Sequence, residues 1–167
     1  AADGLSDLTL PMASFQAWMR DGAPSYLSVV VPSSVTYAAD IAARSNGEIV
    51  ISKGYKFTDD TEQMEEIIRS NYDSIRVDRG ARSDSLTMTG YKTTSSSAPK
   101  ERTLDGVSYY GLQADGKRRV RAALDLFLRV GDTAIYGSGA TDYFVVGTIT
   151  YYVAADAASI IMEAGEA

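Results

Sequence analysis

Alternation of apolar and polar residues, the pattern of a half-buried β-strand, recurs along most of this chain. The strongest example runs from Tyr143 to Val153, where β-branched and aromatic residues surround Gly147. Such residues favour extended chain, and a glycine inside a strand marks a bulge at which the strand bends or changes sheet. The pattern therefore predicts a long, bent strand here, followed by a last strand over residues 159–163.

Shorter runs of the same kind predict further strands, separated by turn residues. Residues 48–57 predict one long strand with a glycine bulge, or a pair of strands, and Asp115-Gly116 predicts a hairpin turn. The other predicted strands cover residues 26–32, 86–91, 107–112, 118–122, 124–128 and 134–136. The chain is accordingly predicted to be mainly β, as β-sandwich or barrel-like lobes with one or two short helices.

Helical spacing competes with this pattern in the middle of the chain. Apolar residues three and four positions apart predict a helix over residues 58–71, although the alternation over residues 67–77 also fits a strand. The Ala-rich residues 36–43 fit either structure.

The first 25 residues are predicted to form an N-terminal arm. The spacing of Phe15 and Trp18 predicts a short helical turn or an irregular segment, and either aromatic residue could anchor the arm. The alternative is that Trp18 is an ordinary core residue. Residues 26–167 form the β-rich domain, which residues 92–103, poor in apolar side chains, could divide into two lobes.

The composition excludes most catalytic classes, because the chain contains neither His nor Cys. It lacks the commonest general base, the commonest zinc ligands, a thiol nucleophile and any disulfide. We therefore predict no enzymatic activity, no cofactor and no metal. The acidic residues within 59–66 could serve as a glycosidase pair or a hard-cation site, but adjacent acids on a turn are usually solvated surface.

The net charge of −6 argues against direct recognition of nucleic acid, which needs a basic surface. No segment approaches the ~20 apolar residues of a membrane-spanning helix. The first residues also lack the basic and apolar regions of a signal peptide, so we expect a soluble protein made in the cytoplasm.

Basic residues gather at two places in the sequence. In residues 117–121, Arg119 and Arg121 would share one face of a strand, which predicts salt bridges to acids of a neighbouring subunit, with phosphate docking as the alternative. Arg79 and Arg82 flank a predicted tight turn that would display both side chains.

Two segments resemble parts of virion proteins of tailed bacteriophages. The first covers residues 73–90. The second joins the Leu-Arg-Val-Gly-Asp-Thr sequence of residues 128–133 to residues 143–152 and to Met162-Glu163. It is similar to the closing hairpins of tail hub and baseplate β-domains, in which a Gly-Asp-Thr turn precedes a strand, a Val-Gly bend and a last strand with an acidic residue.

This resemblance, which covers about half of the chain, implies a structural virion protein of the tail tip or baseplate, or a hub-like component. It implies other tail proteins as partners, a homo-oligomeric ring of three- or six-fold symmetry, no cofactor, and a location in the virion tail after synthesis in the host cytoplasm. The predicted interface residues are Phe15, Trp18, Arg79, Arg82, Arg119 and Arg121.

A different class of function also fits the residues. Tyrosine has a flat apolar ring with a polar tip, on which a sugar ring can stack. A carbohydrate- or receptor-binding β-module would use exposed tyrosines for this purpose, namely Tyr109, Tyr110, Tyr151 or Tyr152.

Overall fold

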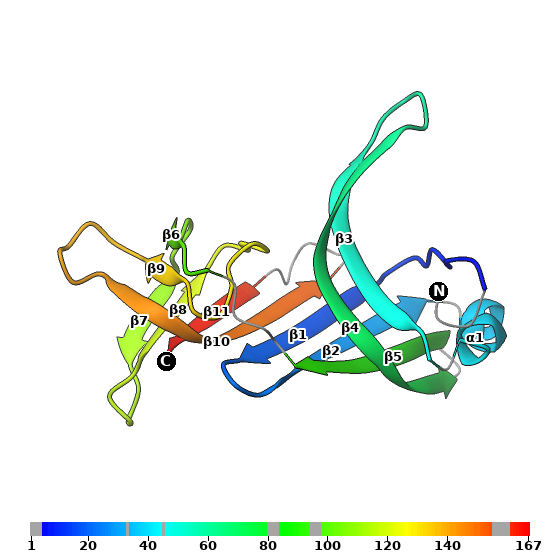
Figure 1. Ribbon diagram of the computed structural model, residues 1–167, viewed down its shortest axis with the longest axis horizontal. Helices are drawn as coiled ribbons and strands as arrows, with labels where there is room; N and C mark the ends of the chain where they lie inside the picture. The colour runs from blue at the N-terminus through cyan, green and yellow to red at the C-terminus, as the bar shows by residue number, and fades with distance from the viewer. Residues whose placement is uncertain (1–4, 33, 45, 80–83, 94–97, 155–160) are drawn as a thin grey trace.

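The computed structural model of the 167-residue chain describes residues 5–32, 34–44, 46–79, 84–93, 98–154 and 161–167. These residues form a large, mostly antiparallel sheet and one helix, which confirms the prediction of a mainly β fold with one or two short helices (Figure 1). The elements are β1 (Ser14–Arg20), β2 (Pro24–Pro32), α1 (Ser34–Ala42), β3 (Glu48–Lys56), β4 (Glu62–Arg79), β5 (Asp84–Thr93), β6 (Glu101–Thr103), β7 (Tyr109–Leu112), β8 (Arg118–Ala122), β9 (Thr133–Ile135), β10 (Tyr143–Ala154) and β11 (Ile161–Glu166).

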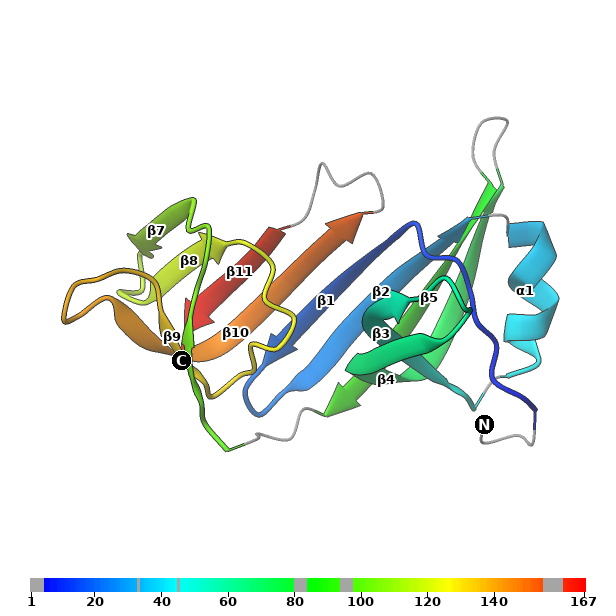
Figure 2. The ribbon, with the colours of Figure 1, turned by 90° about the horizontal axis from the view of Figure 1, so that it is seen from above.

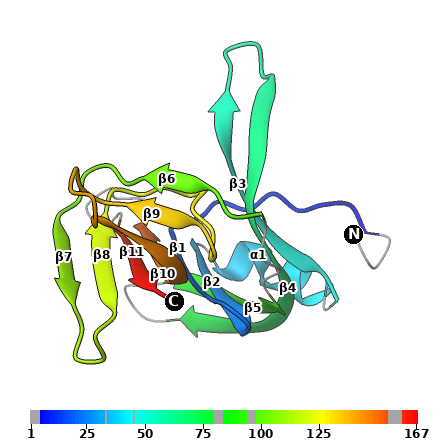
Figure 3. The ribbon, with the colours of Figure 1, turned by 60° about the vertical axis from the view of Figure 1, so that its left-hand side comes forward.

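The sheet joins the two halves of the chain side by side. Its strand order is β3-β4-β5-β2-β1-β10-β11-β8-β7, so β1 lies in the interior, between β2 and β10 (Figure 2). The short parallel pair β6–β9 is attached to the first three residues of β10, Tyr143 to Val145. Figure 3 shows this pair crossing the C-terminal half of the sheet. The chain passes from one half to the other between β5 and β6, inside the segment that was predicted to divide two lobes.

Alternate residues of the interior strands face a single hydrophobic core. In β1, Phe15, Ala17 and Met19 are buried, whereas Gln16 and Trp18 lie on the opposite face, which stays partly exposed. Side chains from outside the sheet strands cover the buried face at both ends of the molecule, namely Ile41 of α1, Leu104, Leu126, Leu128 and Val130.

The structure corrects the prediction for the N-terminal residues. The predicted helical turn at Phe15 to Met19 is wrong, and residues 14–20 are not an arm, because β1 is hydrogen-bonded to a strand on each side. Phe15 and Met19 are four positions apart, and this spacing places two side chains on one face of a strand as well as of a helix. The spacing of these residues alone therefore did not discriminate between a helix and a strand.

The predicted helix over residues 58–71 is also wrong, because most of this segment belongs to β4. Long-range pairing decides the structure here: β4 is hydrogen-bonded to β3 along its first half and to β5 along its second. Residues 67–77 thus have the extended structure that their alternation also fitted. The ambiguous Ala-rich segment is helical, as α1.

The predicted bend at Gly147 is confirmed. The pairing of β10 with β11 shifts by one residue between Val146 and Thr148. Residues 143–145 of β10 pair with β9, whereas β11 pairs from Val146 and β1 from Thr148, so the strand changes neighbours around the glycine. Residues 48–56 form one long strand, but the register shift in its pairing is not at a glycine: Ile51 and Ser52 pair with Ile68 and Glu66, so the extra residue is Ile67 of β4.

Gly90, in the middle of β5, permits a close approach of β4. A Cβ atom at Gly90 would lie 2.3 Å from the carbonyl oxygen of Asn71 and 2.8 Å from Oγ of Ser70. We expect Gly90→Val to lower the free energy of unfolding by about 1–3 kcal/mol, because the two strands must separate to admit the side chain. Urea denaturation measures this loss. The control Thr87→Val, in the same strand, should change stability by less than about 0.5 kcal/mol, and equal losses in both variants would contradict the proposed clash.

Candidate assembly surfaces

Strands β3 and β4 extend away from the rest of the sheet as a two-stranded ribbon (Figure 1). The reason lies in the register: β4 pairs with β5 only from Asn71 to Arg79, whereas its residues from Glu62 to Asn71 pair with β3. Among the described strands, none lies beside residues 62–70 on the other side of β4. The side chains that the structure describes between Ser52 and Glu66 are exposed, whereas Ile49, Ile51 and Ser70 at the base of the ribbon are buried.

Large apolar side chains are exposed near the end of this ribbon. Tyr55, Phe57 and Met64 are 71%, 50% and 55% exposed. Single exposed apolar residues are ordinary on a protein surface, but a group of three on a projecting element is typical of a contact site. The end of the ribbon is the first candidate surface.

Hydrogen bonds within the ribbon's turn hold its shape. The N–H of Phe57 donates to the carbonyl of Thr61 over 2.8 Å, and the hydroxyl and N–H of Thr61 both donate to the Asp59 carboxylate. These two bonds lower the pKa of Asp59. Asp60 adopts the left-handed conformation, with φ of 64°, that a tight turn requires.

Several acidic residues of the ribbon contact other residues of the same chain. Arg69 donates to the carboxylates of Glu66 and Glu48, which raises the pKa of Arg69 and, through the hydrogen bond from Arg69, lowers the pKa of Glu66. Among the described residues, no three acidic side chains come together in a way that could hold a metal ion. The described residues accordingly give no support to the cation site considered for residues 59–66.

The second candidate surface is strand β7, at the opposite end of the sheet from β3. Of the described strands only β8 pairs with it, and Tyr109, Tyr110 and Leu112 are all exposed. The ring of Tyr110 lies 5.6 Å from that of Tyr136, and these rings border two open hollows. The hollows are lined by Val107, Ser108, Tyr109, Tyr110, Gly111, Leu112, Arg118, Arg119, Val120 and Tyr136.

The basic residues of β8 lie next to this edge. Arg119 and Arg121 each approach an oxygen of Glu163 on β11 to 3.2 Å, so two guanidinium groups share one carboxylate. Both arginines remain about half exposed. The sequence predicted that the acidic partner of these two arginines would lie on another subunit. In the structure they share one acidic partner, Glu163, within the same chain, which leaves one positive charge in excess.

The remaining predicted interface residues are not gathered into one site. Phe15 is buried in the core, with 4% of its surface exposed, so its prediction as an interface anchor is wrong. Trp18 is half-buried on the open face of the sheet, opposite Thr150 of β10. Arg79 is exposed at the end of β4, and Arg82 lies outside the described residues.

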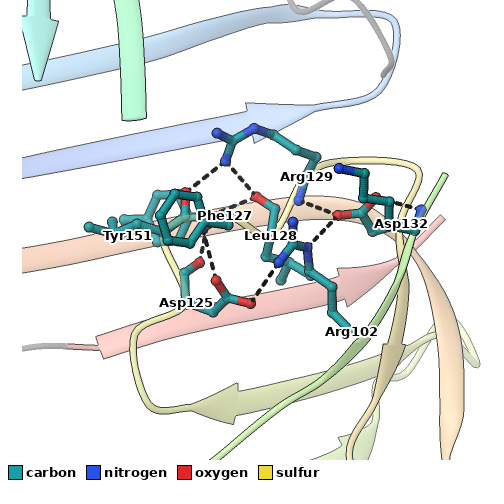
Figure 4. A network of polar contacts seen from close by, with 9 residues as sticks. Arg102, Asp125, Phe127, Leu128, Arg129, Asp132 and Tyr151 are labelled. Carbon is teal, nitrogen blue, oxygen red and sulfur yellow. Dashed lines mark hydrogen bonds and ion pairs between the residues drawn. The ribbon is translucent and has the colours of Figure 1, made fainter. Parts of the chain in front are cut away.

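The Gly-Asp-Thr turn, part of the bacteriophage resemblance, contains a buried carboxylate. Asp132 is 1% exposed and accepts hydrogen bonds from the N–H groups of Lys100 and Arg129, over 3.0 and 2.9 Å, and from Nε of Arg102 over 3.2 Å (Figure 4). The peptide groups of Gly131 and Asp132 are in turn hydrogen-bonded to Val146 of β10. The turn thus fastens β6 and residues 124–132 to the sheet.

Tyr151 belongs to the same network and is fully buried. Its hydroxyl donates to the carbonyl of Leu128 over 2.9 Å and also lies 3.1 Å from that of Asp125. Burial raises the pKa of this phenol well above its usual value. The prediction of Tyr151 as an exposed stacking platform is therefore wrong, whereas Tyr109, Tyr110 and Tyr152 are exposed.

Sequence reasoning missed the apolar residues of the ribbon, although a signal was present. Residues 53–66 mix charged and apolar residues without a consistently apolar face, and the polar sequence Thr58-Asp59-Asp60-Thr61 interrupts them. A strand pair without a buried face must project from its domain, and this reading would have identified Tyr55 and Phe57 as exposed.

No helix in the described part of the chain is long and apolar enough to cross a bilayer. A comparison with models of known protein families finds no match, and a comparison with curated proteins finds no similar sequence. The arrangement of the chain's own residues therefore carries the functional argument.

Proposed function

We propose that this chain is a structural protein of a bacteriophage tail, a tail-tip, baseplate or hub-like component that acts through contacts between subunits. The observation that carries the proposal is the β3–β4 ribbon. A two-stranded ribbon is at best marginally stable in water, and burying exposed aromatic residues on a neighbouring subunit would stabilise it. The resemblance of residues 128–133 and 143–152 to tail hub and baseplate domains adds the bacteriophage context.

Purified virions of the bacteriophage that encodes the chain test this proposal. Immunogold electron microscopy with an antibody against the folded protein should label one end of the tail, and quantitative mass spectrometry should give a copy number that is a multiple of three. Virions that lack the protein, or label confined to the head, would contradict the proposed role.

A second candidate is a carbohydrate-binding module at the β7 edge. The observation in its favour is the pair of open hollows that Tyr110 and Tyr136 both border, with Tyr109 lining one of them, since aromatic rings beside polar groups suit sugar stacking. A glycan array probed with monomeric protein separates the two functions. Binding that Tyr110→Ala abolishes and Tyr152→Ala preserves would favour the module, and an array without bound protein would exclude it for the glycans presented.

A further inference from the structure

We propose that the end of the β3–β4 ribbon docks against the β7 edge of a second copy of this chain. The inference rests on the proposed role in assembly and adds the partner and the two surfaces. Both surfaces expose apolar side chains on strands that have a neighbour on only one side among the described residues: Tyr55 lies on β3, and Tyr110 and Leu112 lie on β7. Strand edges of this kind pair readily with another strand.

The ribbon end and the β7 edge cannot contact each other within one molecule. β3 and β7 are the first and last strands of the sheet order, and the three ribbon views show the ribbon and β7 at separate places (Figures 1–3). A contact between two different surfaces of identical subunits is head-to-tail, and repetition of such a contact produces a ring when the rotation closes. The two surfaces are therefore the donor and acceptor sides that a ring of identical subunits requires.

Charge favours this pairing over contact between two ribbons. Residues 53–66 contain five acidic and two basic residues, so two ribbon ends repel each other. Beside β7, Arg119 and Arg121 share the single carboxylate of Glu163 and leave one positive charge in excess. An acidic ribbon end and a basic edge complement each other, which sets the orientation of docking.

The experiment compares two double variants of the full chain with the wild type. The ribbon variant is Tyr55→Ser with Phe57→Ser, and the edge variant is Tyr110→Ser with Leu112→Ser; Tyr152→Ser is the matched control at an exposed tyrosine elsewhere. Mass photometry and sedimentation at several concentrations should show self-association of wild type and control, and an association constant at least about thirtyfold lower for each double variant.

Mixing the variants identifies the head-to-tail contact. An equimolar mixture of ribbon variant and edge variant retains one intact contact per pair, so it should form a dimer and no larger species. Thermal unfolding checks that each variant is folded. As a second test that does not depend on side-chain truncation, replacing residues 53–65 by Asn-Gly joins the paired residues Ser52 and Glu66 through a two-residue turn, and should give the same result as the ribbon variant.

Several outcomes would overturn the inference. They are a wild type that is monomeric at every concentration, double variants that associate like the wild type, and a mixture of variants that stays monomeric. None of these bears on whether virions contain the protein, so the virion experiment still decides the proposed function independently.

Discussion

Replacing Asp132 by alanine is expected to lower the free energy of unfolding by about 3 kcal/mol. The carboxylate is buried and accepts hydrogen bonds from two peptide N–H groups and from Arg102. Alanine leaves these three donors without their acceptor at a largely buried position. Arg102 retains Asp125 at 3.8 Å and is about a quarter exposed, which limits the loss. Urea denaturation monitored by circular dichroism gives the change.

Asp115 provides the matched control. It also accepts a peptide N–H, that of Lys117 over 3.0 Å, but in an exposed turn. Asp115→Ala should cost less than about 1 kcal/mol, because water replaces the lost acceptor. A similar, small loss in both variants would show that the buried turn does not fasten residues 124–132 to the sheet.

Tyr151→Ala is expected to have a comparable or larger effect, about 3–5 kcal/mol, because it removes one of the largest fully buried side chains of the core. Tyr151→Phe keeps most of the packing and removes only the hydroxyl that bonds to Leu128, so it should cost about 1 kcal/mol. Chemical denaturation at neutral pH measures both. Equal losses would mean that the hydroxyl, and not the packing, supplies the stability.

The wild type and Tyr151→Phe are also expected to differ in how their stability changes at alkaline pH. Burial raises the pKa of Tyr151 in the folded state above the usual 10.0. The protonated phenol therefore contributes fully to the free energy of unfolding below pH 10.0. Above this pH the unfolded chain releases the proton first, so the contribution is lost as the pH rises. The stability of the wild type should fall more steeply above this pH than that of Tyr151→Phe. Parallel curves for the two proteins would contradict the assignment.

The features that could be predicted from the sequence are those that local pattern determines. The run from Tyr143 to Val153 carries strand-forming residues on both sides of Gly147, so its extended structure and its bend followed from the residues alone. The turn at Asp115-Gly116 was equally local, and Gly116 has the positive φ expected there, 79°.

The errors concern segments whose structure depends on distant partners. The spacing of Met64, Ile67 and Ile68 fitted a helix, but the pairing of β4 with β3 and β5 made this segment extended. For β1, the chain near Phe15 resembled an arm because its second neighbour, β10, comes from the other end of the sequence. The contact surfaces were hardest to predict, since Tyr151 and Tyr152 are adjacent in sequence and differ only in which side of the sheet they face.

The position of β1 between the halves of the sheet has a consequence for how the protein folds. Ser14 pairs with Ala154, so the seam between β1 and β10 closes only after nearly all of this sequence has left the ribosome. Strands β1 to β5 can associate earlier, and β1 then presents an open, aggregation-prone edge until β10 arrives. Such a non-local closure makes folding slow, and a prolonged open edge makes the yield of native protein dependent on the concentration of nascent chains.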